Sequence, residues 1–295
     1  MNLKKSSLVI MAGLTFLNFG FTVQNVVLAA KVNPVVKQEN VSEAVKKDLS
    51  LREKFALLWM KTSAEYRALC YQGYNAADKV IDSAVANKNK SNKPLAIILD
   101  CDETVVDNTK GLIARNLNGD SYFDAHFWRE FCKSGKSEAM PGARKFLQGV
   151  HKKGVEIFYV TGRAAKYSAK ESANNFKKLG FPTVDDKHLL MFTTDSNKQP
   201  RFDSVEKDYN VILYMGDNLG DFPLGSKGKN LTERSNIVDT NEDNFGTKYI
   251  IFPNPVYGSW VSALAKGYMK LSPTEKELVD RDVLNKTYST DSIAK

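Results

Sequence analysis

The sequence predicts an α/β fold: a Rossmann-like parallel sheet with helices on both faces, plus a small helical lobe. Two observations lead to this prediction. From about residue 94 onward, apolar runs of strand length alternate with segments of helical pattern, which is typical of a parallel sheet covered by helices. Three of the apolar runs also end in polar side chains, as strands do at the ligand-binding edge of an open parallel sheet.

Helices come first along the chain. In residues 42–87, Leu51, Phe55 and Leu58 fall on one helical face at spacings of three to four residues, so we expect two or three helices before the first strand. A later segment, about residues 105–140, is too long for a simple loop. Its aromatic side chains are Tyr122, Phe123, Phe127, Trp128 and Phe131. We interpret this insert and the leading helices as the helical lobe, placed over the polar edge of the sheet.

The sheet and its helices follow in order. Apolar runs predict strands at 94–99, 156–161, 189–193, 210–215 and 248–252. Helical patterns predict helices at 143–153, 164–179 and 202–209. Gly180 closes the second of these helices, with Pro182 beyond it. The C-terminal part, 271–295, is predicted to be a helix and a tail that is loose after about Thr287.

Two acidic residues follow the first strand directly. Residues 94–109 read PLAIILDCDETVVDNT, so Asp100 and Asp102 stand two residues apart where a buried strand ends. Neighbouring buried carboxylates repel each other and are costly to desolvate, so they need a cation. An ordinary acidic turn after a strand is the structural alternative.

Two more strands end in the same way. Residues 156–163, EIFYVTGR, place Thr161 at a strand end, and residues 210–222, NVILYMGDNLGDF, place Asp217 and Asp221 there. Because the carboxyl ends of parallel strands lie at one edge of the sheet, we expect these side chains to converge.

These motifs resemble those of the haloacid dehalogenase superfamily. They are Asp100-Cys101-Asp102-Glu103-Thr104, Thr161, Lys198 in DSNK, and the stretch GDNLGDF at 216–222. The chain is most similar to the bacterial class C non-specific acid phosphatases, from about residue 57 to about residue 268. The segments LWMKTSAEYRALCYQGYN, MPGARKFL and FPNPVYGSW add to this resemblance.

The resemblance implies a haloacid dehalogenase-like fold and an acid phosphatase that hydrolyses phosphate monoesters, with aryl and nucleoside monophosphates as expected substrates. Asp100 would be the nucleophile and form an aspartyl-phosphate. Asp102 would protonate the leaving oxygen and then take a proton from water. Thr161 and Lys198 would bind the phosphoryl oxygens. For the lysine, a solvated surface position is the alternative, and Lys187 is also near in sequence.

The resemblance also implies one Mg²⁺ per chain, an ion that favours hard oxygen ligands and phosphate. Its ligands would be the carboxylates of Asp100 and Asp217 and the backbone carbonyl of Asp102. Asp221 would bind the water shell of the metal or orient Lys198. Trp128 and Tyr257 would stack on an aromatic or nucleobase leaving group, although core packing is the default role of large aromatic side chains.

The sequence argues against most other functions. The chain has no G-x-S-x-G, H-E-x-x-H or RHG motif, which excludes the hydrolases that need them. A surface nucleotide- or ligand-binding protein with little turnover is the main alternative, and the presence of Asp100 favours the enzyme. Phosphonate cleavage would require a Schiff-base lysine from the lobe, and a mutase would be out of place outside the cell.

The first thirty residues have the layout of a secretory signal. Lys4 and Lys5 precede an apolar stretch, residues 8–23, and small residues reach Ala30. A retained membrane anchor is the alternative. A lipoprotein would need a cysteine at the cut, and the first cysteine is Cys70. We therefore expect an exported bacterial protein, secreted or cell-surface associated, that is not a lipoprotein and has no stable membrane span after cleavage. The predicted parts are 1–30 signal peptide, 31–93 lobe helices, 94–270 core with the insert, and 271–295.

Charge and cysteine content set the remaining expectations. The net charge is +8, which favours small anionic partners, but the lysines are scattered among acids and form no basic face for a nucleic-acid polymer. A homodimer is left open. The chain has three cysteines and no CxxC motif. Cys101, between Asp100 and Asp102, is expected to be a small buried residue. The sequence does not decide whether Cys70 and Cys132 form a disulfide.

Overall fold

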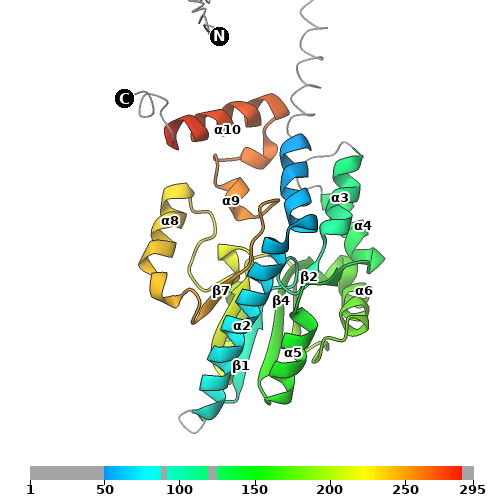
Figure 1. Ribbon diagram of the computed structural model, residues 1–295, viewed down its shortest axis with the longest axis vertical. Coiled ribbons are helices and arrows are strands. Elements are labelled where there is room, and N and C mark those ends of the chain that lie inside the picture. Colours follow the sequence, from blue (N-terminus) through cyan, green and yellow to red (C-terminus); the bar gives the residue numbers. More distant parts are fainter. Residues whose placement is uncertain (1–49, 88–91, 119–124, 288–295) are drawn as a thin grey trace, which may run out of the picture. The chain divides into compact units, whose positions relative to one another are not determined.

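A five-stranded parallel sheet forms the centre of the protein (Figure 1). The computed structural model describes residues 50–87, 92–118 and 125–287; the predicted signal peptide, the end of the predicted tail, Tyr122 and Phe123 lie outside these residues. The strand order is β5-β4-β1-β6-β7. The strands are β1 Leu95–Leu99, β4 Glu156–Ala164, β5 Leu189–Phe192, β6 Asn210–Gly216 and β7 Tyr249–Ile251. All four pairings are parallel, so the predicted α/β fold class is confirmed.

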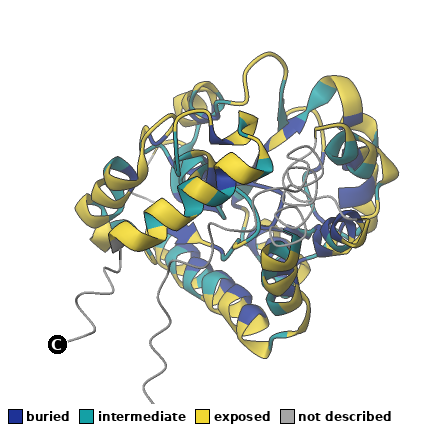
Figure 2. Cartoon of the chain, turned by 90° about the horizontal axis from the view of Figure 1, so that it is seen from above, coloured by how far each residue is buried: buried dark blue, intermediate teal, exposed yellow. Residues whose placement is uncertain are grey.

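Helices cover both faces of this sheet, and its central strand, β1, is therefore buried along its whole length. Alternate residues of β1 point to opposite faces. Ile97 and Leu99 lie in one core cluster, which faces α2 Ala64–Ala86, α5 Ala143–Lys152 and α6 Ala165–Lys178. Ile98 lies in the other cluster with Phe202 of α7 Gln199–Asp208. The helices are buried on their inner sides and exposed on their outer sides (Figure 2).

The position of α2 differs from the prediction that the leading helices belong to the lobe. Its buried side chains, Tyr66, Cys70, Tyr74, Ala77 and Ile81, join the sheet core, and α2 lies beside α5 (Figure 1). The hydroxyl of Tyr74 also donates to the backbone oxygen of Thr104, at 2.5 Å. This apolar stripe is wide enough to cover a sheet face, so α2 is a layer of the core and supports the loop after β1.

The lobe is built from the insert and the helical residues 50–62. The insert contains β2 Val106–Asp107, α3 Thr109–Leu117, α4 Ala125–Ser134 and β3 Glu138–Ala139. Strands β2 and β3 pair antiparallel and were not predicted. Arg115 of α3 forms a buried ion pair with Glu53. A Cβ at Gly111 would lie 2.4 Å from the Phe131 ring, so only glycine lets α3 and α4 come this close.

The C-terminal third adds the remaining elements. They are η3 Leu219–Asp221, α8 Leu231–Thr240, η4 Glu242–Asn244, α9 Ser259–Ser262, η5 Tyr268–Lys270 and α10 Pro273–Thr287. Helix α8 was not predicted, although its capping box of Asn230 and Glu233 is a readable start signal. Among the described residues, no helix is sufficiently long and apolar to span a membrane. Cys70, Cys101 and Cys132 are all free and buried, so the structure contains no bond between Cys70 and Cys132.

Candidate active site

The ends of two neighbouring strands bring the predicted acidic residues together. Asp100 and Asp102 follow β1, and Asp217 follows β6, which pairs with β1. Asp221 lies in η3, directly after that strand end. These four side chains line one cavity of about 660 Å³. The convergence predicted for the carboxyl edge of the sheet is therefore present for all four aspartates.

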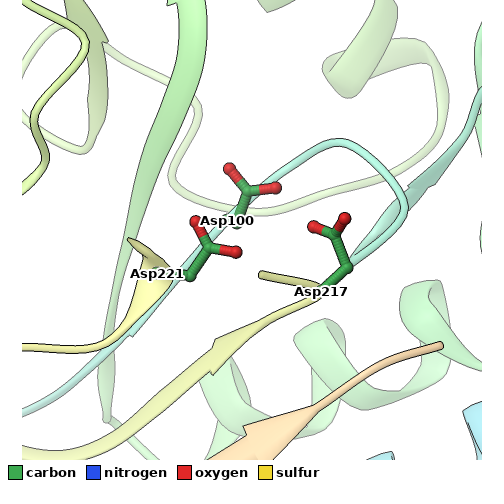
Figure 3. Close-up of side chains that lie close together, drawn as sticks. All are labelled: Asp100, Asp217 and Asp221. Atoms are coloured by element: carbon green, nitrogen blue, oxygen red, sulfur yellow. The ribbon is translucent and has the colours of Figure 1, made fainter. Parts of the chain in front are cut away.

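Three of these aspartates form a compact cluster (Figure 3). One carboxylate oxygen from each of Asp100, Asp217 and Asp221 lies within 4.8 Å of the others. Burial raises the pKa of Asp100 to about 7, with the Lys198 ammonium opposing the shift and Asp221 adding to it. Burial and the charges of Asp221 and Asp100 raise the pKa of Asp217 well above its usual range. The buried carboxylates of the cluster thus repel one another when they are ionised, and their oxygen atoms suit a hard divalent cation.

A buried lysine balances part of this charge. Lys198 stands at the start of α7 and is 8% exposed. Its Nζ forms ion pairs with Asp100 and with Asp221, the latter at 2.7 Å. Burial alone would lower the pKa of Lys198, but these carboxylates raise it, so the ammonium stays charged. Lys187, the other lysine considered, is exposed and lies over the Tyr209 ring.

Arg201 holds the loop that carries Lys198. Its Nη1 donates to the backbone oxygens of Thr161, at 2.7 Å, and Leu190, at 2.9 Å. Its Nη2 donates to the backbone oxygen of Ser196 at 3.1 Å. The guanidinium therefore ties the lysine loop to strands β4 and β5. Sequence reasoning missed Arg201, because nothing in the spacing marks which carbonyl groups an arginine will reach.

Asp102 lines the same cavity but is not part of the three-aspartate cluster. Its carboxylate accepts hydrogen bonds from Arg163, with Nη2 to Oδ1 at 2.6 Å, and from Asn108 Nδ2 at 2.9 Å. Glu103, next to it, has a left-handed φ of 53° and accepts from the backbone N–H of Asn108 at 2.9 Å. Arg163 and Asn108 stand inside the VTGR and VDNT segments, but sequence reasoning assigned neither of them a role.

Thr161 lies on β4, beside β1, and is fully buried. Its Oγ1 accepts from the backbone N–H of Arg163 at 3.1 Å. Within the described residues, the hydrogen of this hydroxyl has no acceptor. Thr161 is not among the residues that line the cavity, although Gly162 and Arg163 beside it are.

The two predicted stacking residues share one wall of the cavity. Trp128 comes from α4 and Tyr257 from the segment before α9, and both line the cavity. Their ring centroids are 6.2 Å apart and their planes are inclined by 55°. The rings therefore contact each other and leave no slot for a third ring between them. A flat ligand would instead lie against this aromatic wall, Trp128 and Tyr257.

Comparison with known proteins finds similar proteins among the acid phosphatases. A family model described as HAD superfamily, subfamily IIIB (Acid phosphatase), matches residues 20–260. The class C acid phosphatase from Bacillus anthracis is 35% identical to this chain, with a TM-score of 0.75, and the match covers 79% of this chain and 97% of that chain. A crystal structure of the Bacillus anthracis class C acid phosphatase with tungstate bound is 33% identical, with a TM-score of 0.73 and coverages of 81% and 97%.

Proposed function

The chain belongs to subfamily IIIB of the HAD superfamily, the acid phosphatases, and we propose that it is an exported, Mg²⁺-dependent member that hydrolyses aryl and nucleoside monophosphates. As a class C type acid phosphatase it is a phosphomonoesterase, so the binding-protein alternative is not retained. The observation that carries the proposal is the cluster of Asp100, Asp217 and Asp221 with Lys198 at the carboxyl edge of the sheet.

The proposed reaction begins with attack by Asp100 on phosphorus. One carboxylate oxygen of Asp100 forms a bond to phosphorus while the bond from phosphorus to the leaving oxygen breaks, and Asp102 gives that oxygen its proton. The resulting aspartyl-phosphate is hydrolysed by water, whose proton returns to Asp102. Lys198 and the hydroxyl of Thr161 stabilise the negative charge on the phosphoryl oxygens in both steps.

A divalent metal is general in this superfamily, and the residues present fit one. The carboxylates of Asp100 and Asp217 and the backbone carbonyl of Asp102 would hold it. Asp221 would help to orient Lys198, because its Oδ1 pairs with that lysine at 2.7 Å, and its Oδ2 accepts from the backbone N–H of Asn218 at 2.9 Å. When bound, Mg²⁺ would neutralise charge on the phosphoryl group and help to orient it.

Removal of divalent cations is expected to stop turnover, and Mg²⁺ is expected to restore it. An Asp217→Asn variant should need at least about tenfold more Mg²⁺ for half-maximal activity, because it loses one of two carboxylate ligands. Activity would be titrated with Mg²⁺ after dialysis against a chelator. Full activity in a sample whose metal content is verified as nil would refute the metal requirement.

The metal-free protein should also lose stability as pH rises from about 4 to about 7. In the folded chain the pKa of Asp100 is raised to about 7, whereas an unfolded aspartate has a pKa of about 3.9. Between these values the folded state binds a proton that the unfolded state has released, so the free energy of unfolding falls with rising pH. Mg²⁺ should reverse this loss at pH 7, and denaturant unfolding with and without Mg²⁺ would measure it.

The aromatic wall supports the proposed substrate class. Stacking on Trp128 and Tyr257 contributes about 1 kcal/mol beyond simple burial, so aryl and nucleoside monophosphates should be preferred over glycerol phosphate. Tyr257→Ala should reduce that preference by up to about fivefold, and leave the hydrolysis of glycerol phosphate nearly unchanged. The kcat/KM values for a panel of nucleoside, aryl and aliphatic phosphates would measure this. Equal losses for all substrates would mean that Tyr257 only packs.

Export is supported by the sequence pattern of residues 1–30, with its lysines, apolar stretch and small residues. These residues lie outside the described part of the chain. Expression in a bacterial host and mass spectrometry of the exported protein would test the proposal, because cleavage after Ala30 leaves Lys31 as the first residue. A chain found only with its first thirty residues intact would contradict it.

A further inference from the structure

Arg163 is a buried cation that contacts one residue of the proposed reaction. Its Nε donates to both carboxylate oxygens of Asp102, to Oδ1 at 3.0 Å and to Oδ2 at 3.1 Å. Its Nη2 donates to Oδ1 at 2.6 Å. The side chain of Arg163 is 0% exposed. Because a planar guanidinium with several donors sets both the position and the tilt of a carboxylate, Arg163 determines how Asp102 faces the cavity.

The guanidinium of Arg163 is itself held from other elements. Its Nη1 donates to Ser172 Oγ of α6 at 3.0 Å, and its Nη2 donates to Ser137 Oγ, just before β3, at 3.1 Å. Its Cζ lies 5.2 Å from the centre of the Phe176 ring. These contacts leave Arg163 little freedom to turn toward a substrate. Because the guanidinium is fixed, the carboxylate of Asp102 that it binds is held in one orientation.

The hydrogen bonds of Asp102 distinguish its two oxygens. Oδ1 accepts three donors: Nε and Nη2 of Arg163 and Nδ2 of Asn108. Oδ2 accepts one donor, Nε of Arg163. A carboxylate oxygen offers about two lone-pair directions, so Oδ1 is fully used and Oδ2 keeps one free. Oδ2 is therefore the oxygen that can carry a proton.

We propose that Arg163 is a positioning residue: it holds Asp102 so that Oδ2 exchanges the proton with the leaving oxygen, and it does not contact the substrate. The proposal rests on the acid role of Asp102. The proton on Oδ2 passes to the leaving oxygen as the bond to phosphorus breaks and its electron pair goes to that oxygen. Asp102 is then a carboxylate, still paired with Arg163, and Oδ2 takes a proton from the water that attacks the aspartyl-phosphate.

Arg163→Lys tests this proposal, because it keeps the charge and loses the planar fork. Aryl phosphates from dinitrophenyl to phenyl phosphate differ in how much the leaving oxygen needs a proton. The variant should lose about 10²-fold in kcat/KM on phenyl phosphate and less than about tenfold on dinitrophenyl phosphate. Inhibition by inorganic phosphate should not change. An equal loss along the series, or weaker phosphate inhibition, would overturn the proposal.

A double variant separates the arginine from the acid. On phenyl phosphate, the double variant Arg163→Lys with Asp102→Asn should be no slower than Asp102→Asn alone. Both substitutions remove the same function, proton transfer by Asp102. Losses that multiply would overturn the proposal. If Asp102→Asn itself lost activity equally along the series, the acid role and this inference would both fail. A graded loss for Asp102→Asn with an even loss for Arg163→Lys would overturn the inference alone.

Two further variants control for folding. Arg115→Lys changes another buried arginine, which pairs with Glu53 in the lobe, and it should lower thermal stability without changing the leaving-group pattern. If Arg163→Lys does not fold, Ser172→Ala removes one contact that holds the guanidinium and leaves Asp102 untouched. Ser172→Ala should lower kcat/KM less than Arg163→Lys does, and again more for phenyl phosphate than for dinitrophenyl phosphate. An equal loss for both substrates would overturn the proposal.

Discussion

Asp100→Asn is expected to lose turnover by about 10⁴-fold or more, on the scale seen when a covalent nucleophile is removed. An amide oxygen is a poor nucleophile and a weaker metal ligand than a carboxylate. The fold should persist, because the change keeps the shape of the side chain and removes one charge from a cluster in which carboxylates repel each other. Lys198 keeps Asp221 as its counter-ion.

Two measurements check this prediction. Steady-state turnover gives the loss, and acid-quenched single-turnover reactions with radiolabelled substrate should show a phosphorylated chain for the parent and none for Asp100→Asn. Asp107→Asn is the matched control, since Asp107 accepts from the backbone N–H of Thr109 at 2.8 Å, a bond that an asparagine can also accept. Substantial activity in folded Asp100→Asn, with deamidation excluded by mass, would show that another residue attacks phosphorus.

Lys198→Met is expected to lose activity by about 10²–10³-fold, as when one preorganised donor to a developing charge is removed. It should also destabilise the protein by about 3–5 kcal/mol at neutral pH, because Asp100 and Asp221 are then buried without their cation. This loss in the free energy of unfolding should be smaller at lower pH. Without the lysine, the pKa of Asp100, already raised by burial, rises further, so the folded state keeps a proton that the unfolded state has released and stability is lost as pH rises.

Lys187→Met is the control for this variant. Lys187 is exposed, so its loss should change neither turnover nor denaturant unfolding by a measurable amount. Activity on phenyl phosphate and unfolding curves at pH 5 and pH 8 would be compared for the two variants. If Lys198→Met retained its activity, the phosphoryl group would have to be bound by other side chains.

The alternation of apolar runs and helical patterns was enough to predict the sheet. Every predicted core strand is present, with ends within a few residues, because a strand buried on both faces must be almost entirely apolar. The pattern did not predict β2 and β3, which have two residues each and are too short to show a period. It also misplaced α2, since an apolar stripe shows that a helix packs but not what it packs on.

The sequence by itself determined which residues stand at the ends of the strands, and so predicted that Asp100, Asp102, Asp217 and Asp221 would meet. Strand ends are local features, and parallel pairing brings them to one edge. Only the tertiary structure decided that Asp102 pairs with Arg163, 61 residues away, and that Trp128 and Tyr257 form one wall. Such contacts depend on how separate segments cross and pack, and no sequence period records that geometry.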